Sequence, residues 1–409
     1  MPLPFTRRHR GADAAGVPAR RLPYVLPYVL QTPGCTPQPM TDTSAPATET
    51  HKFPCDACGS DLRYEPGSDS LVCDHCGNTE TITGSPWTRA AAVAEIDFER
   101  GLKKALADED MEETRVVSCR SCGATVEFDP NVHAAECPFC ATPVVTDTGS
   151  SRHIKPKAVL PFQLTEDDAR SAMNDWLGNL WFAPNGLQQY ARKGRKMSGV
   201  YMPYWTFDAD TRSTYSGQRG TEYRDSRTVT RDGKRQTITV TKVRWRPASG
   251  RVARFFDDVL VTASTSLPDR FRPALGKWDL AELEPYQPVY LAGFRAEAYS
   301  VDLEAAFVEA RELMDRVILR DVKMDIGGDR QRVQAIDTTV SDVTFKHILL
   351  PVWIAAYRYR GRAYRFAVNG RTGMVSGERP WSAIKIALAV IAGLIAAAAV
   401  GYFLAQNQG

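Results

Sequence analysis

Two cysteine quartets with identical spacing constrain this chain more than any other feature of its sequence. Each quartet reads C-x2-C-x14-C-x2-C. A Cys-x2-Cys pair can place two thiolates on one side of a metal ion, and a hairpin between the pairs can bring the second pair to the other side. The spacing therefore predicts two small β zinc ribbons whose ligands are Cys55, Cys58, Cys73 and Cys76 in the first, and Cys119, Cys122, Cys137 and Cys140 in the second.

Both predicted zinc sites are closed. Four thiolates complete the tetrahedral coordination of zinc and leave no position for a catalytic water, so the two Zn²⁺ ions are predicted to be structural. Of the nine cysteines, only Cys35 lies outside the quartets. Such clustering is typical of a reducing compartment rather than of a secreted disulfide framework. Redox-active Cys-x2-Cys pairs are the alternative, although they usually occur singly beside a βαβ unit.

The segments around the quartets have recognisable local patterns. In the first quartet, Pro66-Gly67 separates two short strand patterns. In the second, residues 129–131 form the turn between a strand at 124–128 and a return strand that leads to Cys137. The connector from Trp87 to Thr114 has apolar residues at helical spacing and is predicted to be a helix.

Residues 157–378 are predicted to form an α+β body with an internal duplication. One helix begins at the capping pattern Thr165 to Asp168, and a second begins near Ser300. Each helix precedes a Pro-x-Trp sequence, at Pro203 and Pro351, which is expected to start a strand because proline there costs no ladder hydrogen bond. A chance similarity between two unrelated halves is the alternative.

A basic hairpin is predicted between the two copies, around an Asp232-Gly233 turn. From Arg212 to Arg254 the chain has twelve Lys or Arg residues against three Asp or Glu, whereas the net charge of the whole chain is only +3. The hairpin could contact anionic lipid headgroups or nucleic acid, or it could simply be solvated. The candidate contact residues are Arg231, Lys234, Arg235, Arg244 and Arg246.

The C-terminal run Ile384–Leu404 is 21 residues long and has Lys385 as its only charge. This length matches the hydrocarbon core of a bilayer, and Trp381 and Tyr402 stand where interfacial aromatic residues belong. The sequence predicts one transmembrane helix, with a buried core helix as the alternative. Arg379 and Lys385 flank its N-terminal end, so the positive-inside rule places residues 1–380 in the cytoplasm, at a bacterial inner membrane.

Sequence motifs of several enzyme classes are missing. The chain has no G-x4-G-K-[ST] phosphate loop, no G-x-S-x-G elbow and no H-E-x-x-H pair. The adjacent Asp257 and Asp258 point to opposite faces if they lie in a strand, and they are expected to cap a strand end rather than act in catalysis. The protein is therefore predicted not to be an enzyme.

Over about residues 50–405 the chain resembles a family of bacterial double-zinc-ribbon membrane proteins. Besides the quartets and the apolar run, the matching stretches are YMPYWTFDA, RWRPASGRV, FFDDVLV, YLAGFRAEAY and LLPVWIAAYRYRGRAYRFAVNGRTGMVSGERPWS. Such proteins are often labelled primosomal-helicase-like or transcription-factor-IIB-type zinc ribbons, yet this chain lacks the phosphate loop of a helicase. What the resemblance implies is therefore an architecture rather than an activity.

Together these patterns predict a multidomain chain that acts as a membrane-anchored cytoplasmic scaffold or adaptor for a protein partner. A membrane-tethered nucleic-acid-binding protein is the alternative. Met40 is a plausible true start, because the residues before it look unstructured. The predicted parts are a disordered segment 1–50, zinc ribbon 51–84, helical connector 85–115, zinc ribbon 116–147, α+β repeats 157–280 and 281–378, and a transmembrane helix 384–404.

Overall fold

The computed structural model is mixed and sheet-rich, with a few helices and one apolar C-terminal helix. The chain divides into a unit Met1–Ala47 and a unit Thr48–Gly409, and the predictions of a disordered N-terminus and of a start at Met40 lie outside the described residues. The structure describes residues 53–82, 94–103, 106–127, 134–140, 142–145, 150–180, 197–231, 234–359, 362–378 and 381–406.

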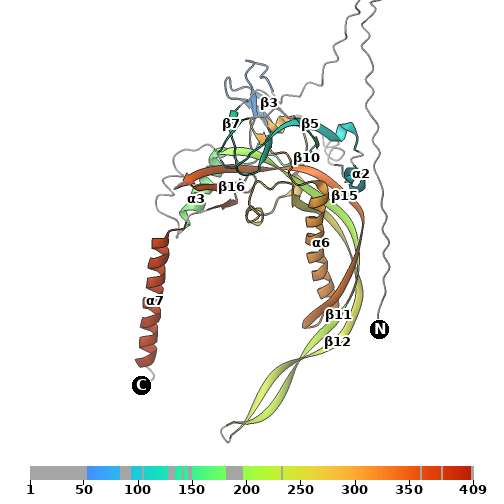
Figure 1. Cartoon of the computed structure of the whole chain (residues 1–409), viewed down its shortest axis with the longest axis vertical. Helices are drawn as coiled ribbons and strands as arrows, with labels where there is room; N and C mark the ends of the chain where they lie inside the picture. Colours follow the sequence, from blue (N-terminus) through green and yellow to red (C-terminus); the bar gives the residue numbers. More distant parts are fainter. Residues whose placement is uncertain are drawn as a thin grey trace, which may run out of the picture. The chain divides into compact units, whose positions relative to one another are not determined.

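A nine-stranded sheet, with strand order β12-β11-β15-β10-β13 along its main path, dominates the second unit. Three very long antiparallel strands lie side by side in it (Figure 1): β11 (Ser198–Arg231), β12 (Lys234–Thr262) and β15 (Arg330–Tyr359). The other members are β4 (Ile96–Asp97), β10 (Ala158–Val159), β13 (Glu284–Pro285), β14 (Arg295–Ala296), β16 (Arg362–Asn369) and β17 (Val375–Gly377).

One helix, α6 (Leu303–Ile326), covers one face of the long strands. Asp302 caps its N-terminus by accepting a hydrogen bond from the Ala305 backbone N–H at 2.8 Å. Its buried residues recur every three or four positions and pack against Trp205 and Phe207 of β11 in one core cluster. The predicted helix near Ser300 is therefore confirmed.

Both neighbours of β11 carry a bulge, β12 opposite Asp208 and β15 opposite the next residue, Ala209. The register of β12 shifts between the partners of Phe207 and Ala209, and that of β15 shifts between the partners of Asp208 and Asp210. Asp258 in β12 and Asp342 in β15 have positive φ values of 52° and 51° there, which aspartate tolerates better than most residues. Because bulges bend and twist a strand, this double bulge accounts for the curvature of the long strands in Figure 1.

Away from α6, the two faces of the sheet are covered by different cores. Neighbouring residues of one strand alternate between them: Tyr201 and Leu349 belong to the first core cluster, whereas Val200, Met202 and Ile348 belong to the second. Successive side chains of a strand point to opposite faces, so the two clusters lie on opposite sides of the sheet. The first contains α3 (Glu166–Gly178), and the second contains α5 (Phe271–Ala274).

The cysteines of the two quartets lie in loops next to short strands, except Cys73, which is the last residue of a strand. The first quartet accompanies a three-stranded sheet of β1 (Leu62–Tyr64), β2 (Ser70–Cys73) and β3 (Thr79–Thr81), in which β1 and β2 form the predicted hairpin. The second accompanies β5 (Met111–Ser118), β6 (Thr125–Glu127) and β9 (Ser150–Ile154), together with a pair formed by β7 (Ala134–Glu136) and β8 (Pro143–Val145). The predicted return strand, β7, thus pairs with β8, while β6 pairs with β5.

The connector helix predicted over Trp87 to Thr114 is wrong within the described residues. Among the described residues of this segment, the only α-helix is α2 (Phe98–Leu102). It is followed by the 3₁₀ turn η1 (Asp108–Asp110) and by strand β5. Ile96 instead enters the large sheet, because it pairs with Phe345 of β15. Ile96 and Phe98 are buried in the core cluster that contains α6, whereas Leu102 is 40% exposed, so the apolar residues do not form one continuous helical face.

The Pro-x-Trp sequences do not start strands. Pro203 lies inside β11 and Pro351 inside β15, and the residues around them pair with one another, as in Tyr201 with Pro351 and Pro203 with Leu349. The expectation that Asp257 and Asp258 cap a strand end is also wrong, because both lie inside β12 at its bulge. The helix predicted at Thr165 is confirmed, with a complete capping box between Thr165 and Asp168.

The strands of the two predicted repeats join a single sheet. Each copy supplies a helix followed by a hairpin, α3 with β11–β12 and α6 with β15–β16, and the duplication stays a prediction. The remaining described elements are η2 (Leu280–Glu282), η3 (Pro288–Leu291) and the C-terminal helix α7 (Ala383–Gln406).

Candidate metal centres

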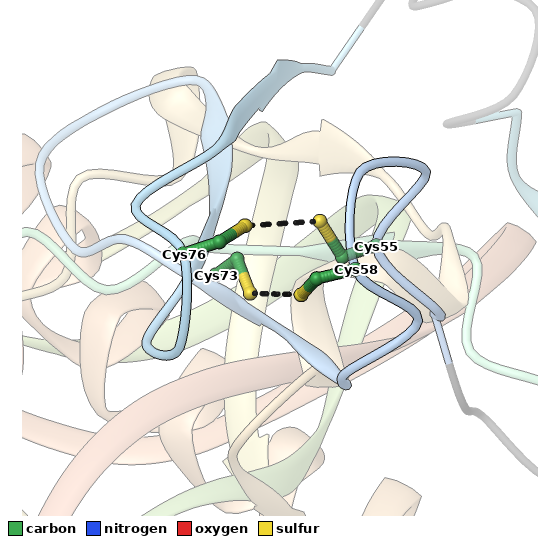
Figure 2. Close-up of side chains that lie close together, drawn as sticks. All are labelled: Cys55, Cys58, Cys73 and Cys76. Atoms are coloured by element: carbon green, nitrogen blue, oxygen red, sulfur yellow. Dashed lines mark hydrogen bonds between the residues drawn. The ribbon is translucent and has the colours of Figure 1, made fainter.

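The first cysteine cluster brings together four sulfur atoms from two loops. Cys55 and Cys76 have their Sγ atoms 3.6 Å apart, and Cys58 and Cys73 have theirs 3.5 Å apart. Figure 2 shows Cys55 and Cys58 on one side of the gap, facing Cys73 and Cys76 on the other. All four Sγ atoms lie within 4.8 Å of one another. A disulfide needs a sulfur–sulfur distance of about 2.05 Å, whereas four thiolates around one zinc ion, at about 2.3 Å each, stand about 3.8 Å apart.

The second cluster repeats this geometry. Cys119 and Cys140 have Sγ atoms 3.6 Å apart, and Cys122 and Cys137 have theirs 3.7 Å apart. Its four sulfurs also lie within 4.8 Å of one another, and all eight cysteines of the two clusters are free thiols. The structure therefore brings the predicted ligands together in two groups of four that could each hold a metal ion.

One backbone turn, repeated at each half-cluster, aims the sulfurs inward. In the first turn the N–H of Gly59 donates to the carbonyl of Cys55, and the N–H of Cys55 donates to the carbonyl of Ser60. In the first three of these turns, the residue after the second cysteine is a glycine with a φ of 73–76°, namely Gly59, Gly77 and Gly123. A residue with a Cβ would be strained in this conformation, which is why glycine recurs there.

The donor set fits zinc better than a hard cation. Sulfur ligands favour zinc or another soft metal ion, and a tetrahedral group of four thiolates is typical of a structural zinc site. In the first cluster, the side-chain amide of Asn78 lies 3.6 Å from Cys55 Sγ as a donor. A hydrogen bond donated to sulfur favours the thiolate, which is the form that binds metal.

The two clusters differ in exposure. In the first, Cys58 and Cys76 are exposed while Cys55 and Cys73 are buried. In the second, only Cys122 is partly exposed. Each cluster also belongs to a different core: the first packs beside Tyr201 and the second beside Val200. The two candidate metal sites therefore lie on opposite faces of the same sheet.

One chain segment, Tyr290–Tyr299, connects both clusters to the sheet. Near its start, the carbonyl of Ala292 accepts a hydrogen bond from the N–H of Tyr64 in the first cluster at 3.0 Å. Near its end, the N–H of Ala298 donates to the carbonyl of Thr125 in the second cluster, and Glu297 forms a bridge with Val126. The sequence indicated this segment only as a matching stretch and not as a link between the clusters.

Glu297 is a buried acid in that segment. It is 1% exposed, and the hydroxyls of Ser264 and Ser266 donate to its Oε1, the former at 2.7 Å. Burial raises the pKa of Glu297 to about 8. The carboxyl group is therefore mainly protonated at neutral pH in the folded chain, while it is ionised in the unfolded chain.

We expect the replacement Glu297→Gln to remove a pH dependence of stability. The pKa of Glu297 is raised from 4.5 to about 8 by folding, so its contribution to stability is full below pH 4.5 and is lost as the pH rises toward 8. The free energy of unfolding that is lost over this pH range is roughly a few kcal/mol. Urea unfolding at pH 5.5, 7 and 8.5 should show the variant gaining on the parent chain as the pH rises. Parallel pH profiles for both would contradict this, and the exposed Glu312→Gln is the matched control.

A third group of acids surrounds the bulge of the sheet. Asp208, Asp257 and Asp258 offer oxygen atoms within 4.8 Å of one another. Nearby, Nζ of the buried Lys346 lies 2.8 Å from Asp258 and 3.2 Å from Glu95. Burial raises the pKa of Asp208 to about 7, and a hydrogen bond with Asp208 lowers the pKa of Glu95 to about 2. Lys346 thus already pairs with Asp258 and Glu95, as in a structural ion network.

The basic hairpin is real and much longer than the sequence predicted. Beyond the bulge, β11 and β12 pair without a register shift from Ala209 and Phe256 out to Arg231 and Lys234, and Asp232-Gly233 lies outside the described residues. The candidate contact residues do not form one patch: Arg235 pairs with Thr230, whereas Arg244 pairs with Thr221, and these pairs lie on opposite faces of the hairpin. Arg246 lies on the same face as Arg244, opposite Arg219.

One described helix is long and apolar enough to cross a membrane. The window Ala383–Gly401 in α7 has a mean hydropathy of 2.5, and none of it is buried. Ile384 and Leu394 are among its exposed apolar side chains, at 75% and 67%. The alternative of a buried core helix does not fit this exposure.

Comparison with known proteins gives a relative but no activity. The chain is 27% identical to a protein of Bacillus subtilis (strain 168) named uncharacterized protein YdjG, over 336 residues that cover 82% of this chain and 92% of the relative. No protein-family model matches the chain. No solved structure matches it either.

Proposed function

We propose that this protein is a non-enzymatic scaffold, anchored in the bacterial inner membrane by α7, whose two zinc ribbons stabilise a cytoplasmic platform for a protein partner. The observation that carries the proposal is the position of the cysteine clusters. Each cluster packs into one of the two cores on opposite faces of the central sheet. A metal ion at each position would hold the platform together from both sides.

The chemistry of the clusters supports a structural role for the metal. Four thiolates would surround each ion and leave no open position for water or substrate. The clusters would therefore contribute free energy of folding rather than catalysis, as structural zinc does in small ribbon domains. A platform of this kind acts through the surfaces that it presents.

The proposed topology follows from charge and from the state of the thiols. Arg379 and Lys385 lie on the N-terminal side of the apolar run, and the tail after Leu404 has no charged side chain. The positive-inside rule then favours a cytoplasmic location for residues 1–380. Free thiols that bind zinc suit the same reducing compartment.

Affinity capture of the full chain from detergent-solubilised membranes tests the proposal, with and without nuclease. We expect a protein to co-purify in stoichiometric amount under both conditions, and to be lost when Cys137→Ser removes a ligand of the second cluster. Capture of the chain alone from membranes under both conditions would contradict a scaffold.

A nucleic-acid-binding role is the second candidate, and the basic hairpin favours it. Phosphate contacts would give an affinity that falls steeply with salt and that weakens when Arg231, Lys234 and Arg235 are neutralised. Material that co-purifies only without nuclease, together with that response to the triple substitution, would establish it over the scaffold. Unchanged affinity in the triple variant would contradict it.

A further inference from the structure

The far part of the hairpin formed by β11 and β12 stands apart from the rest of the sheet. Strand β15 pairs with β11 only as far as Gly220, opposite Arg330. Beyond that point, residues 221–231 and 234–244 pair only with each other among the described residues. We call this two-stranded ribbon the arm. Isolated two-stranded hairpins are marginally stable in water. The solvent exposure of both faces of the arm is therefore unusual.

The two faces of the arm have different chemistry. Four large apolar side chains are exposed on the arm: Tyr223, Val229, Ile238 and Val240, at 40%, 37%, 46% and 45%. The register puts all four on one face. Tyr223 and Val229 are separated by an even number of positions along β11, and Val240 and Ile238 of β12 pair with Asp225 and Arg227, which lie on the same face of β11. The opposite face pairs hydroxyl residues instead: Ser226 with Thr239 and Thr228 with Thr237.

Basic side chains accompany the apolar ones on the same face. Arg227 stands opposite Ile238, Lys242 opposite Tyr223, and the guanidinium of Arg244 lies 5.2 Å from the centre of the Tyr223 ring. Asp225 is the acid on this face and is already paired with Lys242 and Arg227. The arm as a whole has seven Lys or Arg against three Asp or Glu over residues 221–244, of which Arg224 and Arg235 lie on the opposite face.

We propose that this apolar, basic face of the arm lies against the anionic headgroup surface of a lipid bilayer. Apolar side chains beside lysine and arginine are the combination that binds membrane interfaces, where the apolar groups enter the acyl boundary and the cations meet anionic lipids. The inference rests on the membrane anchor proposed above, because α7 would tether the chain to a bilayer.

The composition of the face argues against nucleic acid as its occupant. Binding of single strands relies on aromatic platforms for base stacking, and Tyr223 is the aromatic residue among the exposed apolar side chains of the arm. The aliphatic Val229, Ile238 and Val240 have no role in contacts with phosphate. A lipid surface uses both the aliphatic and the cationic side chains.

Hydrogen–deuterium exchange of the full chain tests the inference, in nanodiscs of phosphatidylcholine alone and in nanodiscs with one third phosphatidylglycerol. We expect the amides of residues 221–244 to exchange about tenfold more slowly, or slower still, in the anionic nanodiscs. The difference should disappear in high salt and in the variant Val229→Ser/Ile238→Ser/Val240→Ser. Thr228→Ser/Thr237→Ser/Thr239→Ser on the other face is the matched control and should keep the protection.

Equal exchange of the arm in the two bilayers would overturn the inference, as would protection that appears only when nucleic acid or a captured protein is added. A second variant, Lys242→Gln/Arg244→Gln, keeps the apolar residues and should lose much of the anionic effect, which guards against a hairpin that unfolds in the serine variant. The membrane anchor is tested separately, by measuring whether the chain inserts into both kinds of nanodisc. If the chain inserts into neither, the same exchange comparison with vesicles added from outside decides the inference about the arm.

Discussion

The variant Cys137→Ser will lose one of two zinc ions and a large part of the folding free energy of the chain. Cys137 is 2% exposed and lies in the core cluster that also contains Val200 and Ile348 of the central sheet. Loss of the ion would release a turn that covers one face of the sheet. Structural zinc contributes an apparent ~10–16 kcal/mol in small zinc modules, so we expect the variant to melt far below the parent chain or to aggregate.

The control for this prediction is Cys35→Ser, which removes the ninth thiol without touching either cluster. It should leave the zinc content and the melting temperature unchanged. Cys58→Ser in the more exposed first cluster should also cost one zinc ion. A Cys137→Ser chain that melts with the parent would contradict a structural role for the second cluster.

The variant Ile391→Lys/Leu394→Lys will move the protein out of the membrane fraction. Both residues lie in the apolar window of α7 and are 53% and 67% exposed. A lysine near the centre of a transmembrane helix costs about 2.5–3.5 kcal/mol on insertion scales. Two such substitutions should abolish resistance to carbonate extraction.

The swap Ile391→Leu/Leu394→Ile keeps the hydropathy of α7 and serves as the control for that change. It should remain in the carbonate-resistant pellet with the parent chain. Retention of the double-lysine variant in that pellet would show that α7 does not anchor the protein.

Local patterns in the sequence predicted those features that depend on neighbouring residues. The spacing of the cysteines predicted which four sulfurs would meet in each cluster, because the ligand turns are built from five or six consecutive residues. The capping box at Thr165 likewise predicted the start of α3. The apolar run predicted α7, since length and hydropathy are properties of a single segment.

Features that depend on distant pairing could not be predicted in this way. Ile96 fits a helical pattern with its neighbours, yet it pairs with Phe345, far along the chain, and the pairing decided its conformation. Pro203 and Pro351 look like strand starts until β11 and β15 are seen to pair through them. Tertiary context overrode local preference in both cases.

The buried acids were missed for the same reason. Glu297 and Arg295 are the two charged residues of an otherwise mostly apolar stretch, and that contrast was a signal of burial for Glu297. Asp208 and Lys346 come together only because β11 and β15 are neighbours, in a register that the sequence does not display. The apolar face of the arm was missed because the basic residues were counted along the chain and not assigned to faces.

The zinc content of the intact chain tests the central claim most directly. The full-length protein, purified in detergent under reducing conditions without added metal, should carry two zinc ions per chain by elemental analysis. Its eight cluster thiols should react with a thiol reagent only after a chelator removes the metal. One zinc ion or none per chain, or eight thiols that react freely in the folded protein, would contradict two closed zinc sites that hold the sheet from both faces.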